Sequence, residues 1–133
     1  MARQTTSRVP KKRFGFPKSV RLLRTADFRK VYSEGRRRNV DWLLAFSLPT
    51  GKPLSRVGFA VPSSLGGAVE RNRVKRRLRE AVRTNLSELG PGWDIVLRPR
   101  SPALSLEFAA IEETVQKFFR ACARSAGDRR PEN

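Results

Sequence analysis

The chain contains no histidine and only one cysteine, Cys122, among its 133 residues. Without histidine, neither a Ser–His nor a Cys–His nucleophilic site can form, and the commonest general base of enzymes is missing. A single cysteine excludes a disulfide within the chain, and the lack of histidine excludes a zinc site built from Cys and His. These absences lead us to expect no catalytic residue on the protein.

Acidic residues are also scarce, with 12 Asp and Glu against 29 Lys and Arg, which gives a formal net charge of +17. A metal nuclease needs several carboxylates that converge on one site, and here the acids are dispersed. The adjacent pair Glu112 and Glu113 falls on different faces of a predicted helix. We therefore expect no metal site on the protein and a polyanionic partner that offsets its self-repulsion.

Long apolar runs are missing too. No stretch approaches the roughly 20 residues that a membrane-spanning helix needs, and the first residues lack the apolar run of a secretory signal. The lone thiol fits a reducing compartment. We expect a cytoplasmic protein with no membrane partner: a flexible basic arm over residues 1–20, a single domain over 21–123 and a disordered tail over 124–133.

The spacing of apolar residues predicts both helices and strands. Three helices are predicted, over about 25–35, 68–89 and 105–122. Predicted strands cover residues 40–48, 57–61 and 93–97. Thr25 and Ser105 are expected to be N-caps, and Gly35 is expected to end the first helix. The order of helix, two or three strands, long basic helix, strand and helix indicates an α+β layer fold.

The predicted strand over 40–48 follows directly on a run of three arginines, Arg36 to Arg38. Its apolar residues alternate, so that one face of the strand would carry Val40, Trp42, Leu44, Phe46 and Leu48.

The long helix is the most basic segment, because residues 71–83 hold seven basic residues and a single acid, Glu80. Helical geometry gathers its apolar side chains on one side: Val74, Leu78, Ala81 and Val82. On the opposite side, within about 60° of one another, fall Asn72, Arg76, Arg79 and Arg83. A solvated helix face normally mixes charges of both signs. We interpret this cationic ridge as a surface for nucleic-acid phosphates.

Three aromatic residues, Phe28, Tyr32 and Phe46, allow two interpretations. Aromatic side chains are core residues by default. Stacking platforms for unpaired bases, however, need aromatic side chains beside basic ones, and basic residues surround the first two. The residues alone leave both interpretations open.

The segment from Gly66 to Glu80, which contains Arg71-Asn72-Arg73, resembles the "RNR" signature of the bacterial ribonuclease P protein family. Further segments resemble that family in its order, over about residues 20–123: residues 27–35, 56–61 and 93–100. The resemblance implies an αβββαβα two-layer sandwich with a central sheet. It also implies a left-handed βαβ crossover, against the usual hand, as in the second domain of a small-subunit ribosomal protein.

The resemblance further implies a ribonucleoprotein enzyme in which the RNA subunit, not the protein, is the catalyst. That RNA removes the 5′ leader of precursor tRNA in a reaction dependent on Mg²⁺, which it holds mainly itself. The protein would bind the catalytic RNA through Arg71, Asn72, Arg73, Lys75, Arg76 and Arg79. It would bind the leader in a cleft with Phe28, Tyr32 and Phe46. Its partners would be the RNA subunit and precursor tRNA.

The chain departs from the family at Ser63-Ser64, where a pair of lysines is common. The cationic contact at that position is therefore weaker, and the run from Arg36 to Arg38 is a candidate to compensate. Two other functions fit the same composition: a structural RNA-binding protein of ribosomal type, and a stand-alone metal nuclease.

Overall fold

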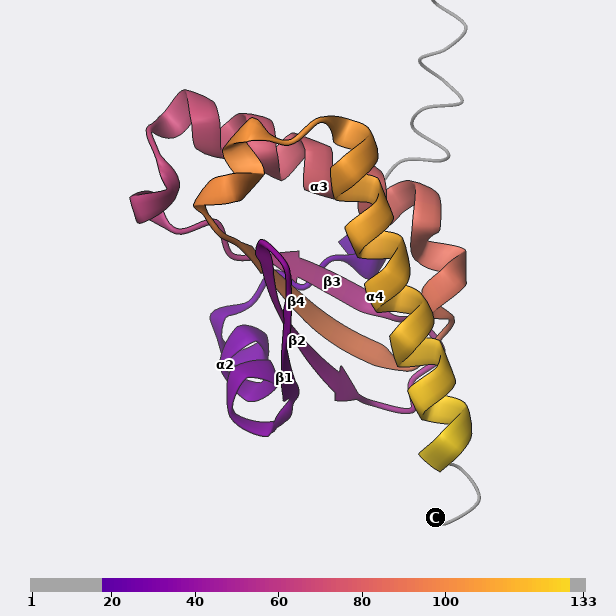
Figure 1. Cartoon of the computed structure of the whole chain (residues 1–133). Coiled ribbons are helices and arrows are strands. Elements are labelled where there is room, and N and C mark those ends of the chain that lie inside the picture. The colour runs from indigo at the N-terminus through magenta and orange to yellow at the C-terminus, as the bar shows by residue number, and fades with distance from the viewer. Residues whose placement is uncertain (1–17, 130–133) are drawn as a thin grey trace, which may run out of the picture.

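The computed structural model describes residues 18–129 (Figure 1). Its helices are α2 (Thr25–Glu34), α3 (Ala68–Leu89) and α4 (Phe108–Arg129). Its strands are β1 (Arg36–Val40), β2 (Leu43–Pro49), β3 (Arg56–Phe59) and β4 (Trp93–Pro99). Short 3-10 helices are η1 (Lys18–Val20), η2 (Ser63–Leu65) and η3 (Ser101–Ser105). The element order confirms the predicted αβββαβα arrangement.

The four strands form one mixed sheet in the order β1-β2-β4-β3. β2 pairs antiparallel with both β1 and β4, whereas β3 and β4 are parallel and are joined through α3. α3 and α4 pack together on one face of this sheet, and the shorter α2 covers part of the other face (Figure 1). The sandwich of sheet and helices is thus present, with α2 as a partial cover on its second side.

The main core lies between the sheet and the pair α3–α4. Its fully buried side chains include Leu43 of β2, Ile95 and Leu97 of β4, Leu78 of α3 and Ile111 of α4. A smaller cluster under α2 contains Leu22, Val31 and Val96. Both faces of the central strands β2 and β4 are therefore covered.

The prediction of one strand over residues 40–48 is wrong, because the chain reverses at Asp41 and Trp42 between β1 and β2. Asp41 adopts a left-handed backbone with φ of 57°, a conformation that Asp tolerates better than most residues. The indole Nε1 of Trp42 donates a hydrogen bond to Thr114 Oγ1 of α4 at 3.2 Å. Side chains of β2 point alternately to the two faces of the sheet. Leu43 and Ala45 point toward the main core, and Phe46 points toward α2.

The first helix ends at Gly35 as predicted, but it begins at Thr25 after an Arg24 cap position, and no side chain caps it. The Gly35 amide donates to the Val31 carbonyl oxygen at 2.8 Å. A Cβ at Gly35 would lie 2.5 Å from that oxygen and 2.9 Å from the Ser47 oxygen. Only glycine permits this close approach of helix and sheet.

The ends of the described chain differ from the predicted boundaries. Residues 18–20 form η1 with Val20 buried, and the rest of the predicted arm lies outside the described residues. At the other end, α4 begins at Phe108, since η3 occupies the residues up to Ser105, and it continues to Arg129. Within residues 18–129, none of the helices is long and apolar enough to cross a membrane.

Candidate nucleic-acid interface

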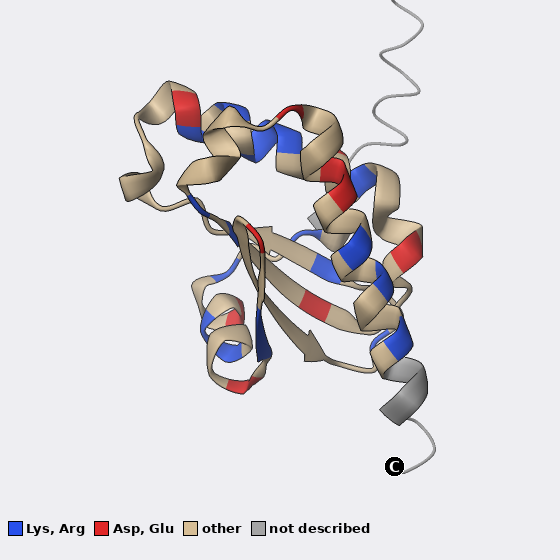
Figure 2. Ribbon diagram, in the orientation of Figure 1, with Lys and Arg blue, Asp and Glu red and all other residues tan. Residues whose placement is uncertain are grey.

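Helix α3 separates apolar and basic side chains as its sequence predicts. Val74, Leu78, Ala81 and Val82 are all buried against the core. On the other side, Asn72, Lys75 and Arg76 are exposed. Figure 2 shows the basic residues of α3 in blue along the helix. The predicted cationic ridge therefore lies on the surface.

Three arginines of this helix have partners within the protein. The Arg71 Nε donates to the Gly66 carbonyl oxygen at 3.2 Å, and the Arg77 Nη1 donates to the Leu106 carbonyl oxygen at 2.9 Å. Arg83 forms an ion pair with Glu80. The hydrogen bonds that Arg83 donates to the Glu80 carboxylate raise the pKa of Arg83. Arg83 was expected on the ridge, but its charge is compensated locally. With Arg83 paired to Glu80, the other basic residues of this segment lie between Arg71 and Arg79.

Arg73 and Arg79 differ from these three. Their Nε atoms are buried, yet neither has a hydrogen-bond partner among the residues that the structure describes. A buried donor without an acceptor costs about 1–3 kcal/mol. Both side chains are only half-buried, so an acceptor from a bound molecule can reach their guanidinium groups.

The three predicted aromatic residues lie together on the α2 side of the sheet. The ring centroids of Phe28 and Tyr32 are 6.4 Å apart, and those of Tyr32 and Phe46 are 4.8 Å apart with an edge-to-face angle of 78°. Phe28 and Phe46 are half-buried beside the small core cluster, and Tyr32 is 38% exposed. Each ring thus packs on the protein and also keeps a surface toward solvent.

The position of Phe28 depends on a glycine in the neighbouring strand. A Cβ at Gly58 of β3 would lie 2.5 Å from the Phe28 Cζ and 2.9 Å from the Leu22 Cβ. The missing side chain therefore makes room for the Phe28 ring against the sheet.

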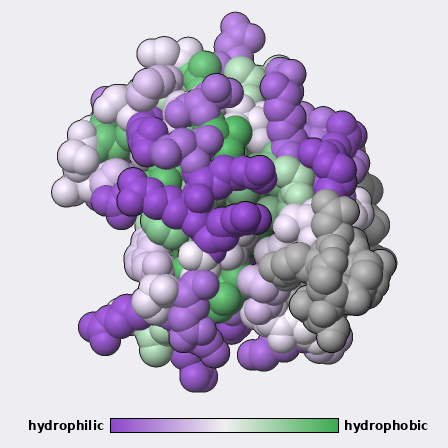
Figure 3. Space-filling view, turned by 60° about the horizontal axis from the view of Figure 1, so that its bottom comes forward, coloured by the Kyte–Doolittle hydropathy of each residue, from purple (hydrophilic) through white to green (hydrophobic). Residues whose placement is uncertain are grey.

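Basic residues border the aromatic cluster on the sheet itself. Arg37 of β1 is the direct partner of Phe46 in the antiparallel register, so their side chains share one face. Arg98 of β4 is the partner of Leu44 and is exposed on the same face. Figure 3 views the molecule from below and shows hydrophilic side chains crowding around small hydrophobic patches. Aromatic and cationic groups are therefore adjacent, which base stacking on a bound strand requires.

A shallow cavity of about 210 Å³ connects this aromatic side with the basic helix. Lys75 and Arg79 of α3 line it together with Phe28, Phe59 and Arg21. Sequence reasoning missed Arg21, because its placement depends on an isolated parallel bridge to Val57 at the edge of β3. The two predicted binding regions are thus continuous around this edge of the sheet.

Arg56 fixes the start of α2 on the sheet. Its Nε and Nη2 donate to the two carboxylate oxygens of Asp94 at 3.0 and 2.7 Å, and its Nη1 lies 3.3 Å from Asp27 of α2. The hydrogen bond with Asp94 is the main cause of the raised pKa of Arg56. This bidentate pair joins β3 and β4 to the helix turn that carries Phe28, and it was also missed from sequence.

Ser63 and Ser64 are exposed in η2, next to β3. The candidate for compensation, Arg36 to Arg38, does not lie beside these serines, because β1 is at the opposite edge of the sheet from β3. Instead, Ser64 shares a cavity of about 210 Å³ with Arg98 and Arg100. These two arginines supply positive charge in the same cavity as Ser64.

Carboxylates do not gather near this interface. Within residues 18–129, no group of three or more Asp, Glu, Cys or His side chains is placed to hold a metal ion.

The comparison with protein families agrees with this geometry. The model of the family described as Ribonuclease P matches residues 16–123. This chain belongs to the ribonuclease P protein family. A relative from Roseiflexus sp. (strain RS-1), a ribonuclease P protein component, is 42% identical over 113 residues, which cover 84% of this chain and 93% of the relative.

Solved structures of ribonuclease P proteins have the same fold. The protein from Thermotoga maritima matches with a TM-score of 0.70 and 28% identity, over 76% of this chain and 96% of that one. The protein from Staphylococcus aureus matches with a TM-score of 0.68 and 27% identity, over 75% and 92%. Family membership and topology thus agree with the signature in α3.

Proposed function

We propose that this chain is the protein subunit of a cytoplasmic ribonuclease P, which removes the 5′ leader of precursor tRNA to give the mature 5′ end. The observation that carries the proposal is the cationic stretch of α3 from Arg71 to Arg79, where two buried arginine donors lack acceptors among the described residues. Family membership supports the same conclusion and disfavours a structural protein of ribosomal type.

The catalytic RNA subunit binds α3 in this proposal. Its contact residues are Arg71, Asn72, Arg73, Lys75, Arg76 and Arg79. Phosphate oxygens accept from the guanidinium groups and displace counterions from the RNA. Arg71 has a second role, because its bond to the Gly66 carbonyl oxygen holds the loop before the helix. Phosphates are also the acceptors that the Nε atoms of Arg73 and Arg79 lack.

The single-stranded leader binds the aromatic cluster of Phe28, Tyr32 and Phe46. Each ring keeps an accessible surface beside arginines of the sheet, and such a platform stacks unpaired bases without regard to their sequence. The leader therefore gives precursor tRNA an extra contact that mature tRNA lacks.

Catalysis belongs to the RNA subunit in this proposal. The protein has no histidine, and the described residues contain no group of three or more Asp, Glu or Cys side chains that could hold a metal ion. The Mg²⁺ ions that the holoenzyme requires are therefore assigned to the RNA, and the protein raises substrate affinity when Mg²⁺ is low.

Reconstitution tests the proposal directly. The protein, the cognate RNA subunit and precursor tRNA are mixed at low Mg²⁺, and each component is omitted in turn. Cleavage at the mature 5′ end should require the RNA subunit and should rise when protein is added. Cleavage by RNA-free protein with Mg²⁺ would instead identify a stand-alone nuclease.

A further inference from the structure

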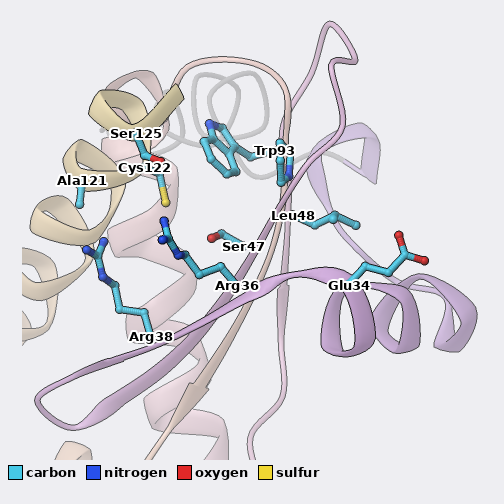
Figure 4. Close-up of a pocket in the computed structure, with 10 residues that line it drawn as sticks. Glu34, Arg36, Arg38, Ser47, Leu48, Trp93, Ala121, Cys122 and Ser125 are labelled. Carbon is cyan, nitrogen blue, oxygen red and sulfur yellow. The ribbon is translucent and has the colours of Figure 1, made fainter. Parts of the chain in front are cut away.

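A second basic pocket lies on the face of the sheet opposite the aromatic cluster. It has a volume of about 390 Å³ and lies between β1, β2 and the last turns of α4. Arg36 and Arg38 of β1 line it, with Ser47, Trp93 and Cys122 (Figure 4). We call it the β1–α4 pocket. Neither the family signature nor the aromatic cluster contributes a residue to it.

The two arginines face this pocket because of their register. Arg36 pairs with Ser47 and Arg38 pairs with Ala45, and these partners face the main core side. Arg37 between them points to the other face, beside Phe46. Figure 4 shows both guanidinium groups reaching toward α4, near Cys122 and Ala121. Strand β1 therefore presents arginine on both of its faces.

The positive charge in the pocket also affects the thiol. Burial raises the pKa of Cys122 to about 11, while a hydrogen bond from Ser47 and the charges of Arg38 and Arg36 oppose this rise. The two guanidinium groups are thus close enough to Cys122 to act on it electrostatically.

Neither arginine has its charge compensated within the described part of the chain, where the ion pairs involve other residues. Glu34 also lines the pocket, but it lies beyond Leu48, at the other end from the arginines (Figure 4). Two guanidinium groups over one cavity match the oxygens of a phosphate better than a single ammonium would.

We propose that the β1–α4 pocket binds phosphates of an RNA backbone, as a contact separate from α3 and from the aromatic cluster. The proposal rests on the proposed function, since it assumes an RNA partner. Arg36 and Arg38 are two residues apart on a strand, or about 7 Å, so they can contact different phosphates of one chain. Because β1 is an edge strand, an RNA strand on the aromatic face can pass around it to this pocket.

A second protein chain fits this edge poorly. Pairing of β1 with a copy of itself would bring two runs of arginine together, and like charges at an edge strand oppose such pairing.

The test replaces both arginines in the full chain, as R36A/R38A. The control, K52A/R124A, removes the same charge from exposed positions outside the pocket. One arm measures the salt dependence of binding to the RNA subunit alone. The other measures the salt dependence of holoenzyme binding to precursor tRNA with a long or a short leader.

We expect R36A/R38A to reduce the salt dependence of the binding constant, seen as a smaller slope of log K against log salt concentration, in one of these two experiments. The slope should fall by about 1.4 if the partner is the single-stranded leader, and only with the long leader. It should fall by about 1.8 in the first arm if the partner is a helical part of the RNA subunit. R36K/R38K, which keeps the charges, should retain most of the slope.

Unchanged slopes in both arms, or equal losses in K52A/R124A, would overturn the proposal. A melting curve for each variant checks that the fold is intact. The variant R73A/R76A on α3 shows whether such a result refutes only the pocket or the proposed function as well. If that variant loses RNA binding while R36A/R38A does not, only the pocket is refuted. If neither loses it, the proposed function fails.

Discussion

The two halves of α3 differ in how their polar side chains are satisfied. In the second half, Asn85 is buried and donates to the Ala81 carbonyl oxygen at 2.9 Å and to Glu112 of α4 at 3.1 Å, and it accepts from Gln116 at 3.0 Å. In the first half, Arg73 buries a donor without an acceptor among the described residues, and Arg79, just past the midpoint of the helix, does the same. The polar side chain of the second half is therefore satisfied by hydrogen bonds within the protein, whereas the basic segment has donors available for a binding partner.

This difference identifies the functional half better than charge alone. Arg83 and Arg120 carry the same formal charge as Arg73, but they pair with Glu80 and Glu88. Because a compensated arginine releases few counterions from RNA, net charge overstates the binding surface.

The largest effect is expected when the first half of the helix loses its charge. R73A/R76A should weaken binding to the RNA subunit by about 3 kcal/mol or more, since each charge-assisted hydrogen bond contributes roughly 1.5–3 kcal/mol. The salt slope should fall by about 0.7–0.9 for each phosphate that the variant no longer binds. Filter binding over a salt series measures both quantities.

The matched control for that experiment is R83A/R120A, which removes the same charge from paired positions. It should change the salt slope much less. Equal effects of the two double variants would show that only net charge matters and would remove the distinction between paired and unpaired arginines.

Replacing the buried polar residue in the second half of α3 should lower the stability of the fold instead. N85A leaves Glu112 and Gln116 without their shared partner, and we expect the free energy of unfolding to fall by about 2 kcal/mol. Denaturant titration measures this loss. RNA affinity of the folded fraction should stay the same, and a binding defect without loss of stability would contradict the assignment.

The aromatic cluster gives a smaller, substrate-specific effect. Y32A should weaken binding of precursor tRNA by about 1–2 kcal/mol and leave mature tRNA almost unaffected, because only the precursor has a leader to stack. Paired titrations of the two RNAs, with a melting curve, measure this. A large drop in Tm with equal losses for both RNAs would show that Tyr32 is a core residue.

The smallest effect concerns pH. The pKa of Cys122 rises from 9.0 to about 11 on folding, so the unfolded chain loses its thiol proton first as the pH increases. Stability from this group is complete below pH 9 and is lost between about 9 and 11, by roughly 1 kcal/mol at pH 10. Urea unfolding at pH 8 and pH 10 measures it. In C122A this loss of stability between pH 8 and pH 10 should disappear. If C122A loses as much stability as the unmodified protein, the loss comes from other titrating groups.

The sequence predicts the helices well because their signals are local. The apolar side of α3 repeats with the helical period, and Gly35 and Gly90 mark helix ends. The hairpin between β1 and β2 was missed because its turn, Asp41-Trp42, contains neither glycine nor proline.

The parts of the site that depend on distant residues could not be read in the same way. The pair of Arg56 with Asp94 joins positions 38 residues apart, and the β1–α4 pocket needs the register of β1 against β2 and the position of α4. The aromatic residues could be named from sequence, but their packing against one another and their partial exposure required the fold.

The strand order has a consequence for how the chain folds as it is synthesised. β4 lies between β2 and β3 in the sheet, yet it is the last strand to be made. Until residues 93–99 leave the ribosome, β2 and β3 have no common neighbour, and the apolar side of α3 has no complete sheet to cover it. Pairing of β3 with β4 must close the long segment that contains α3, so assembly of the sheet is the slow step. The nascent chain therefore presents its basic helix before it has a core.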